Sequence, residues 1–279
     1  MREYLTQTEN ELTKGKSAKR INGYSMSTYQ SLIIKTKLIR MKNRNIIFLI
    51  LPLLILTLNL SPALGQVKEP SEYLTKDSIE EKGFTLIFVN KDPLFKPEMI
   101  SRLKETFFTV YPKLAKDYNK KTAKKVLFII DPQYDGVAGT SAGQVVFSPK
   151  WFYDHPEDID VVTHEVMHIV QAYGNSPGPG WLTEGIADYV RYEYGVNNPA
   201  AGWTLPDVKP GQSYTNAYRI TARFLVWLEQ RKDKKIVETL DEVMRDHTYS
   251  DGIWEKLAGK NLDELWKEYV SDPKIGSKG

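Results

Sequence analysis

Residues 164–168 read His164-Glu165-Val166-Met167-His168, and they lie in a stretch, Glu157 to Tyr173, whose apolar residues recur at helical spacing. In a helix, residues four apart lie on one face about one turn apart, so the two imidazoles can share an ion. Glu165 lies beside them, placed to hold a water rather than the ion. The opposite face is apolar and is predicted to pack into the core; its residues are Ile159, Val162, Val166, Ile169 and Val170.

A metal at this motif must be held by histidine and carboxylate, because the chain contains no cysteine. Zinc needs a third protein ligand and an open position for water. The metzincin arrangement would place glycine and histidine three and six residues after His168, where this chain has Gln171 and Gly174. That class is therefore excluded, and neither His155 nor His247 has a recognisable ligand spacing. The alternative is a buried helix whose histidines are satisfied by other hydrogen bonds.

A second predicted helix, from about Trp181 to Tyr194, carries Glu184 and Asp188 four residues apart on one face. A cation and a cationic partner would relieve the repulsion between these two carboxylates. We expect Glu184 to be the third zinc ligand and Asp188 to accept the free ring N–H of a ligating histidine. Gly185 would allow the two helices to approach closely. The alternative is a solvated acidic helix face.

These residues predict hydrolysis by a zinc-activated water, with Glu165 as the general base that later delivers the proton to the leaving amine. The oxyanion formed in that reaction needs a further donor. We select Tyr218, at the start of a helix predicted over Asn216–Arg231, as that donor, with Arg219 and Arg223 as weaker candidates. A purely structural role is the alternative for any one of the sixteen tyrosines.

The order of the predicted elements, strands first and helices afterwards, indicates one α+β domain over residues 83–271. Residues 66–82 are expected to form a linker, 135–142 a loop and 272–279 a polar tail. The expected strands are Phe84–Val89, Val126–Ile130 and Val145–Phe147, with a long helix after Pro97 between the first two. The later helices are expected at Trp181–Tyr194, Asn216–Arg231, Lys234–Asp246 and Asn261–Val270, the last with a capping box of Asn261 and Glu264.

The N-terminal region resembles a secretory signal. Residues 41–45 are basic, 46–60 are apolar, and Ala63 and Gly65 suit a signal peptidase site, so we expect a signal peptide over 41–65 and export to the periplasm or the medium. Residues 1–40 are interpreted as a start-site artefact or an N-terminal extension. A membrane anchor is the alternative, but fifteen residues fall short of the ~20 that span a bilayer. After cleavage, no stable membrane association is expected.

Charge along the chain argues against a nucleic-acid partner. Residues 1–45 carry ten Lys/Arg and three Asp/Glu, whereas residues 66–279 carry 28 Lys/Arg against 32 Asp/Glu. The part expected to fold is thus mildly acidic, and a polyanionic backbone requires a concentrated basic face.

Several segments together resemble the plant-type basic secretory proteins, a zincin-like family near the gluzincin metallopeptidases. The resemblance covers about residues 136–270. It rests on the segments Val137–Gly143, His164–His168, Gly180–Arg191, Tyr218 with Thr221–Leu225, and Leu262–Tyr269. It implies a zincin-like fold, in which a small mixed sheet packs on the active-site helix and a helical C-terminal half follows. It also implies Glu184 as third ligand and supports Tyr218 as a site residue.

By analogy with gluzincins, the strand Gln144–Phe147 would form the edge on which a peptide substrate pairs. The resemblance therefore implies a secreted zinc-dependent metallopeptidase that acts on a peptide or protein substrate. Two alternatives stay open: a zinc-containing protein that binds cell-wall or host polymers without cutting them, and zinc-assisted hydrolysis of a non-peptide amide or ester.

Overall fold

A computed structural model describes residues 72–174 and 178–276. The predicted N-terminal extension (1–40) and signal peptide (41–65) lie outside the described residues. The strands are β1 Thr75–Glu81, β2 Phe84–Asn90, β3 Lys125–Ile130, β4 Ala138–Ser141 and β5 Gln144–Phe147. The helices are α1 Pro97–Asp117, α2 Pro149–Asp154, α3 Val161–Gln171, α4 Gly180–Tyr194, α5 Tyr218–Arg231, α6 Ile236–Arg245, α7 Ile253–Ala258 and α8 Leu262–Ser271, with a 3-10 turn at Tyr214–Asn216 before α5. None of the described helices has the length and hydropathy that crossing a membrane requires.

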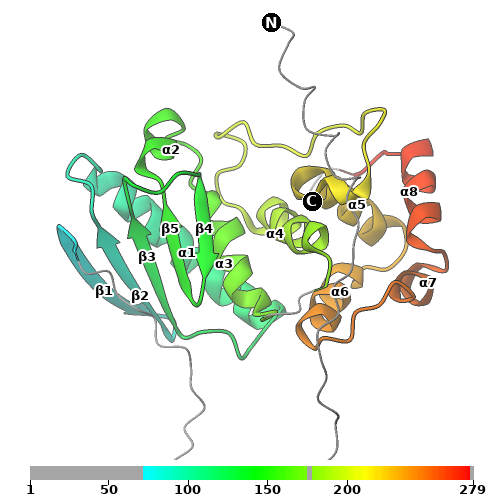
Figure 1. Ribbon diagram of the computed structural model, residues 1–279, viewed down its shortest axis with the longest axis horizontal. Coiled ribbons are helices and arrows are strands. Elements are labelled where there is room, and N and C mark those ends of the chain that lie inside the picture. The colour runs from blue at the N-terminus through cyan, green and yellow to red at the C-terminus, as the bar shows by residue number, and fades with distance from the viewer. Residues whose placement is uncertain (1–71, 175–177, 277–279) are drawn as a thin grey trace, which may run out of the picture. The chain divides into compact units, whose positions relative to one another are not determined.

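The strands form one mixed sheet in the order β1-β2-β3-β5-β4. The inner strands β2, β3 and β5 are parallel, and each outer strand is antiparallel to its neighbour. In Figure 1 the sheet and α1 occupy one half of the described fold and α5 to α8 the other, with α3 and α4 between them. The predicted α+β class, with a small mixed sheet and a helical C-terminal half, is confirmed.

Both outer strands were missed by the sequence prediction. Strand β1 lies within the expected linker 66–82, and β4 lies within the expected loop 135–142. Strand β1 is exposed except for half-buried Ile79, and β4 has only small residues, so neither shows an apolar alternation. Each is one arm of a hairpin with a two-residue turn, Lys82-Gly83 or Ala142-Gly143, in which both residues have positive φ.

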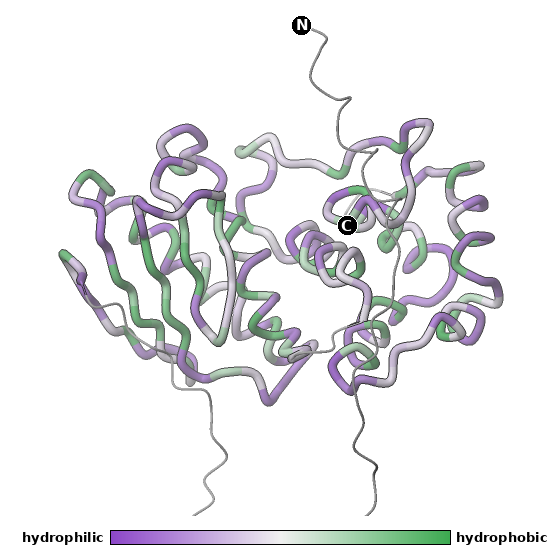
Figure 2. Tube along the Cα trace, in the orientation of Figure 1, coloured by the Kyte–Doolittle hydropathy of each residue, from purple (hydrophilic) through white to green (hydrophobic). Residues whose placement is uncertain are grey.

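The core forms where the sheet meets α1 and α3. Strands β2 and β3 are buried along almost their whole length, as the continuous green of these strands in Figure 2 indicates. One face of α1 covers the sheet, including Phe107 and Tyr111, which stack on each other with ring centroids 4.8 Å apart. The apolar residues predicted to pack into the core are buried: Val162, Val166, Ile169 and Val170 of α3 and Ile159 just before it are all at most 7% exposed.

Helix α3 begins at Val161 rather than at Glu157. Asp160 immediately precedes it and is fully buried; its carboxylate accepts hydrogen bonds from the Thr163 hydroxyl and from the backbone N–H groups of Val196 and Asn197. This carboxylate joins the start of α3 to the segment after α4. Residues 156–160, before the helix, form turns. The short helices α2 and α7 were not predicted.

The four later helices lie within two residues of their predicted bounds, and the capping box of Asn261 and Glu264 at α8 is confirmed. The expected polar tail is not free: Trp227 and Arg231 of α5 bond to Asp272, and the Gly276 N–H donates to Gln230. Gly185 does allow a close helix approach, but to α5 rather than α3. A Cβ at Gly185 would lie 2.2 Å from Thr221 Cγ2.

Candidate active site

The structure brings together the three predicted metal ligands. His164 Nε2 lies 3.2 Å from His168 Nε2, and Glu184 Oε2 lies 3.3 Å from the first nitrogen and 3.5 Å from the second. Helix α3 supplies both imidazoles and α4 supplies the carboxylate. Among the described residues these three form the one group of histidine and carboxylate side chains spaced to hold a metal ion.

The spacing of these atoms fits a small divalent cation. Tetrahedral ligands about 2.0–2.1 Å from an ion lie about 3.3 Å from one another, close to the observed 3.2 to 3.5 Å. Two imidazoles and one carboxylate are also a ligand set that zinc accepts while keeping a fourth position open. The residues present therefore fit zinc.

Each imidazole is oriented by a hydrogen bond at its other nitrogen. His164 Nδ1 lies 2.7 Å from Asp188 Oδ1, and His168 Nδ1 lies 2.7 Å from Gln171 Oε1. Gln171 is fixed in turn, since its Nε2 donates to the Thr183 carbonyl at 2.9 Å. When both Nδ1 atoms donate, both Nε2 lone pairs face Glu184 and are available to a metal.

Asp188 lies where the sequence placed it, but Gln171 was missed. The sequence prediction used Gln171 only to exclude another ligand arrangement. It lies at the last position of α3, three residues after His168, and the chain turns into the left-handed region at Ala172 (φ 47°). The spacing of three residues on a helix is the one signal that would have identified it.

The electrostatics of the cluster favour a cation. Burial disfavours the charged ring of His164, but the carboxylates of Asp188, Glu184 and Glu165 outweigh it and raise the pKa of His164 to about 10. Burial also opposes the charge of Glu184, yet its hydrogen bonds to the two imidazoles lower its pKa well below the usual range. In the absence of a metal, the site therefore holds a proton in its place.

Glu165 lies beside the ligands and contacts the sheet. Its side chain meets Thr140 of β4: Thr140 Oγ1 lies 2.7 Å from Glu165 Oε2 and 3.0 Å from the Glu165 backbone carbonyl. Glu165 is 7% exposed and lines the same cleft as the two histidines. Thr140 was not predicted, because it belongs to the strand that sequence reasoning assigned to a loop.

Tyr218 faces the metal ligands from the first residue of α5. Its ring lies parallel to the His164 ring, with centroids 6.2 Å apart and planes 17° apart, although the residue is 54% exposed. The negative charge of Glu184, followed by burial, raises the pKa of Tyr218, so its hydroxyl keeps its proton. Ala217 and Tyr218 both have positive φ, 61° and 48°, and such strain in non-glycine residues is concentrated at functional sites.

The two weaker candidates for the oxyanion donor, Arg219 and Arg223, lie in different places. Arg219 lines the cleft. Arg223 instead pairs with Asp207 at 2.8 Å and lies 3.4 Å from the Pro273 carbonyl, which places its guanidinium against the C-terminal segment. Among the described aromatic residues of α4 and the segment after it, Trp203 lines the cleft, whereas Trp181, Tyr189, Tyr192 and Tyr194 do not.

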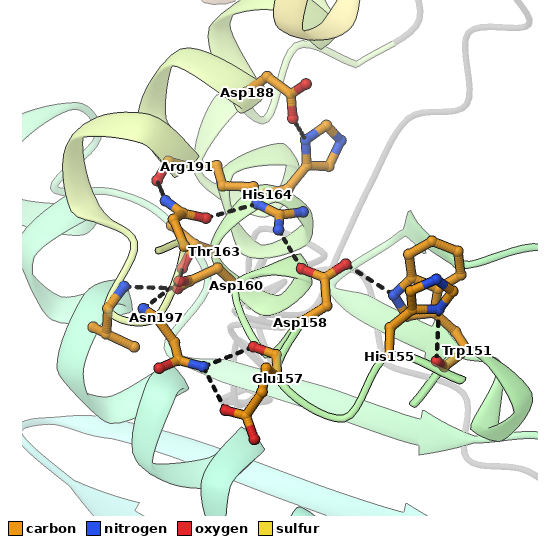
Figure 3. A network of polar contacts seen from close by, with 12 residues as sticks. Trp151, His155, Glu157, Asp158, Asp160, Thr163, His164, Asp188, Arg191 and Asn197 are labelled. Atoms are coloured by element: carbon orange, nitrogen blue, oxygen red, sulfur yellow. Dashed lines mark hydrogen bonds and ion pairs between the residues drawn. The ribbon is translucent and has the colours of Figure 1, made fainter. Parts of the chain in front are cut away.

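A buried polar network fixes the N-terminal end of α3 against α4 (Figure 3). Arg191 Nη2 donates to Asp158, and both side chains are at most 10% exposed. Asp158 also accepts from Trp151 Nε1 at 3.0 Å, and the Trp203 ring covers the Arg191 guanidinium at 4.5 Å. Removing one partner of such a pair would leave an uncompensated buried charge, so the network holds the two ligand-bearing helices in register.

The candidate ligands line a cleft of about 2250 Å³ bounded on one side by β4. The sequence analogy assigned the cleft edge to Gln144–Phe147, but this strand, β5, is internal, and β4 lies outside it. The structure therefore corrects the edge strand to Ala138–Ser141. One end of the cleft adjoins Trp151 and Trp203, and the other adjoins the segment 120–125.

Solved structures with a similar fold include zinc metallopeptidases. A two-domain M1 zinc metallopeptidase mutant bound to L-tryptophan shares 13% identity (TM-score 0.47), with coverage of 74% of this chain and 53% of that one. An M1 zinc metallopeptidase from Deinococcus radiodurans shares 9% (TM-score 0.45; 73% and 53%). Aminopeptidase A from Legionella pneumophila in complex with aspartic acid shares 15% (TM-score 0.49; 69% and 27%). The chain thus spans about half the length of the M1 structures, or less for the aminopeptidase.

None of the curated proteins compared with the chain matches it. The structural likenesses are weak, and the assignment rests instead on a sequence match. Residues 85–269 match the family model BSP, described as a peptidase of plants and bacteria. That range contains the candidate ligands, Glu165 and Tyr218, and it agrees with the resemblance to basic secretory proteins. The chain belongs to this peptidase family of plants and bacteria.

Proposed function

We propose that this protein is a zinc-dependent metallopeptidase in which His164, His168 and Glu184 hold the metal and Glu165 is the general base. One observation carries the proposal: three ligand atoms 3.2 to 3.5 Å apart lie in a cleft with a carboxylate that is not itself a ligand. A structural metal site has no use for that extra carboxylate, whereas hydrolysis requires a base.

Each residue has a distinct part in the reaction. A bound zinc ion would supply Lewis acidity, which polarises a carbonyl and makes water easier to deprotonate. Glu165 accepts the proton of the attacking water and returns it to the leaving amine. The 2.7 Å contact from Thr140 holds the Glu165 carboxylate toward the cleft. Asp188 and Gln171 keep the two imidazole rings oriented.

Tyr218 serves as the donor to the oxyanion. Its raised pKa keeps the hydroxyl protonated, and its ring already lies over His164. A donor directed at developing negative charge stabilises the transition state more than the ground state. Because Tyr218 is 54% exposed at the cleft, a substrate can reach it without rearrangement of the core.

Export is part of the same proposal. Residues 41–65 have the basic, apolar and small-residue pattern of a cleaved signal, so the mature protein would begin at Gln66 and act in the periplasm or outside the cell. N-terminal sequencing of protein recovered from the medium or periplasm tests this point. A start far from Gln66 would contradict it.

The test of the peptidase is the variant Glu165→Gln with its metal measured. We expect chelator-sensitive cleavage of a peptide mixture to fall by at least about 10² to 10⁴-fold, while one zinc per chain is retained. Glu255→Gln, at an exposed position of α7, is the matched control and should cleave like the natural protein. Full activity of Glu165→Gln would show another base, and zinc without cleavage in the natural protein would favour a non-catalytic binding protein.

A further inference from the structure

The cleft has a strongly basic end. Lys120, Lys121, Lys124 and Lys125 are exposed, and all four line the cleft. The carboxylates among the described lining residues are Asp158, Glu165, Glu184 and Asp188, and all four lie in the candidate metal site or in the buried network at the opposite end. No ion pair within the described residues involves any of the four lysines.

The basic end is attached to the active-site helix. Asn119 Nδ2 donates to the Val170 carbonyl at 2.8 Å, and the Thr122 hydroxyl lies 3.3 Å from the Ile169 carbonyl. These bonds place the lysine segment beyond the C-terminal end of α3, past His168. From His164 to Val170, whose carbonyl accepts from Asn119, is six residues at 1.5 Å each, or about 9 Å. An extended peptide covers that distance in about three residues.

Strand β4 sets the direction in which a peptide would cross this cleft. It begins at Ala138, paired with Phe147 near the α2 end, and finishes at Ser141, paired with Gln144. Gln144 pairs in turn with Leu127, two residues after Lys125, so β4 runs toward the lysines. A peptide added antiparallel to β4, the slightly more stable pairing, begins at the lysine end and runs toward Trp151.

From these positions we infer that the enzyme selects acidic peptides, with aspartate or glutamate beginning about three residues on the N-terminal side of the scissile bond. This inference rests on the proposed function, since it names the substrate class of the same cleft. Lys124 lies over the Phe84 ring at 4.2 Å, but none of the four cations is neutralised by a carboxylate among the described residues. Such cations at one end of a cleft attract a segment of opposite charge and repel a basic one. The lysines are exposed, so the selectivity must weaken as salt screens them.

The test compares peptides that share one cleavable core and carry four aspartates, four serines or four lysines on either side of it. We expect the peptide with aspartates on the N-terminal side to have a kcat/KM about tenfold above the serine peptide at about 0.02 M salt, and near parity at about 0.5 M. The variant Lys120→Glu with Lys121→Glu should abolish or reverse this preference. Lys234→Glu with Lys235→Glu, an exposed pair outside the cleft lining, should leave it unchanged.

A binding measurement separates failure of this inference from failure of the proposed peptidase. The same peptides, labelled with a fluorophore, are titrated into the Glu165→Gln protein. If nothing is cleaved by the natural protein but the acidic peptide still binds about tenfold more tightly in a lysine-dependent way, the preference for acidic peptides is supported and the peptidase is refuted. Three results would each overturn the inference. All peptides could bind and be cleaved equally, the lysine changes could leave the preference unaffected, or the protein could prefer aspartates on the C-terminal side.

Discussion

In each histidine of the candidate metal site, Nδ1 lies 2.7 Å from a side-chain oxygen, but the group that carries this oxygen differs between the two. His164 is oriented from a neighbouring helix by a carboxylate, Asp188, and is stacked against Tyr218. His168 is oriented from within its own helix by an amide, Gln171, at the same distance of 2.7 Å. A carboxylate orients the ring and also makes it more basic, whereas a neutral amide only orients it. We conclude that His164 carries most of the electrostatic tuning of the site, and the predictions below test that difference.

Of the three tests of this difference, the largest effect is expected for Tyr218, which lies beside His164, and it is an effect on catalysis. Tyr218→Phe keeps the ring that lies over His164 and removes the donor hydroxyl. We expect kcat to fall by about 10² to 10³-fold while zinc affinity stays within about twofold, because the hydroxyl is not among the ligand atoms. Steady-state kinetics with zinc titration provide the check. A fall in zinc affinity parallel to the fall in kcat would mean that Tyr218 supports the metal instead.

An intermediate effect is expected on zinc affinity when the hydrogen-bond partner of either imidazole, Asp188 or Gln171, is removed. The two losses should be unequal. Removing such a partner lowers affinity by about 10 to 100-fold. We expect Asp188→Asn near the upper end of that range, because it removes a charge, and Gln171→Met near the lower end, because it removes only an orienting bond. Competitive zinc titration against a chromophoric chelator measures both. Equal losses, or a greater loss for Gln171→Met, would break the comparison.

The smallest expected effect is on the stability of the metal-free protein. The pKa of His164 is raised to about 10 in the folded chain, above about 6.5 in an unfolded one. The folded state then binds the extra proton, so this stabilisation is complete below pH 6.5 and is lost as pH rises through 10. In chelator, Tm should therefore decrease between pH 6.5 and pH 10 in the natural protein and in Gln171→Met. A decrease as large in Asp188→Asn would show that the carboxylate is not its cause.

Sequence reasoning predicted the parts of the site that lie at fixed helical spacings. His164, His168 and Glu165 are set by the geometry of one helix, and Glu184 and Asp188 by that of the next. The parts it missed depend on tertiary contacts. Gln171, three residues after His168, is held for that contact by the Thr183 carbonyl of α4. Thr140 reaches Glu165 because β4 lies beside α3.

The same distinction holds for the fold. The buried strands β2 and β3 were predicted because their residues are apolar without interruption, as is typical of buried parallel strands. The outer strands β1 and β4 lack that signal and are defined by hairpin turns with positive φ at Lys82, Gly83, Ala142 and Gly143. One side of the cleft is bounded by such a strand, β4, which explains why the sequence analogy assigned the substrate-binding edge to β5.

The most direct test of the account is a crystal structure of the purified protein with anomalous data collected at the zinc absorption edge. We predict one strong anomalous peak about 2.0–2.2 Å from Nε2 of His164, Nε2 of His168 and an Oε atom of Glu184. A zinc ion bound without Glu184, or no peak between α3 and α4 in protein that cleaves peptides, would contradict it.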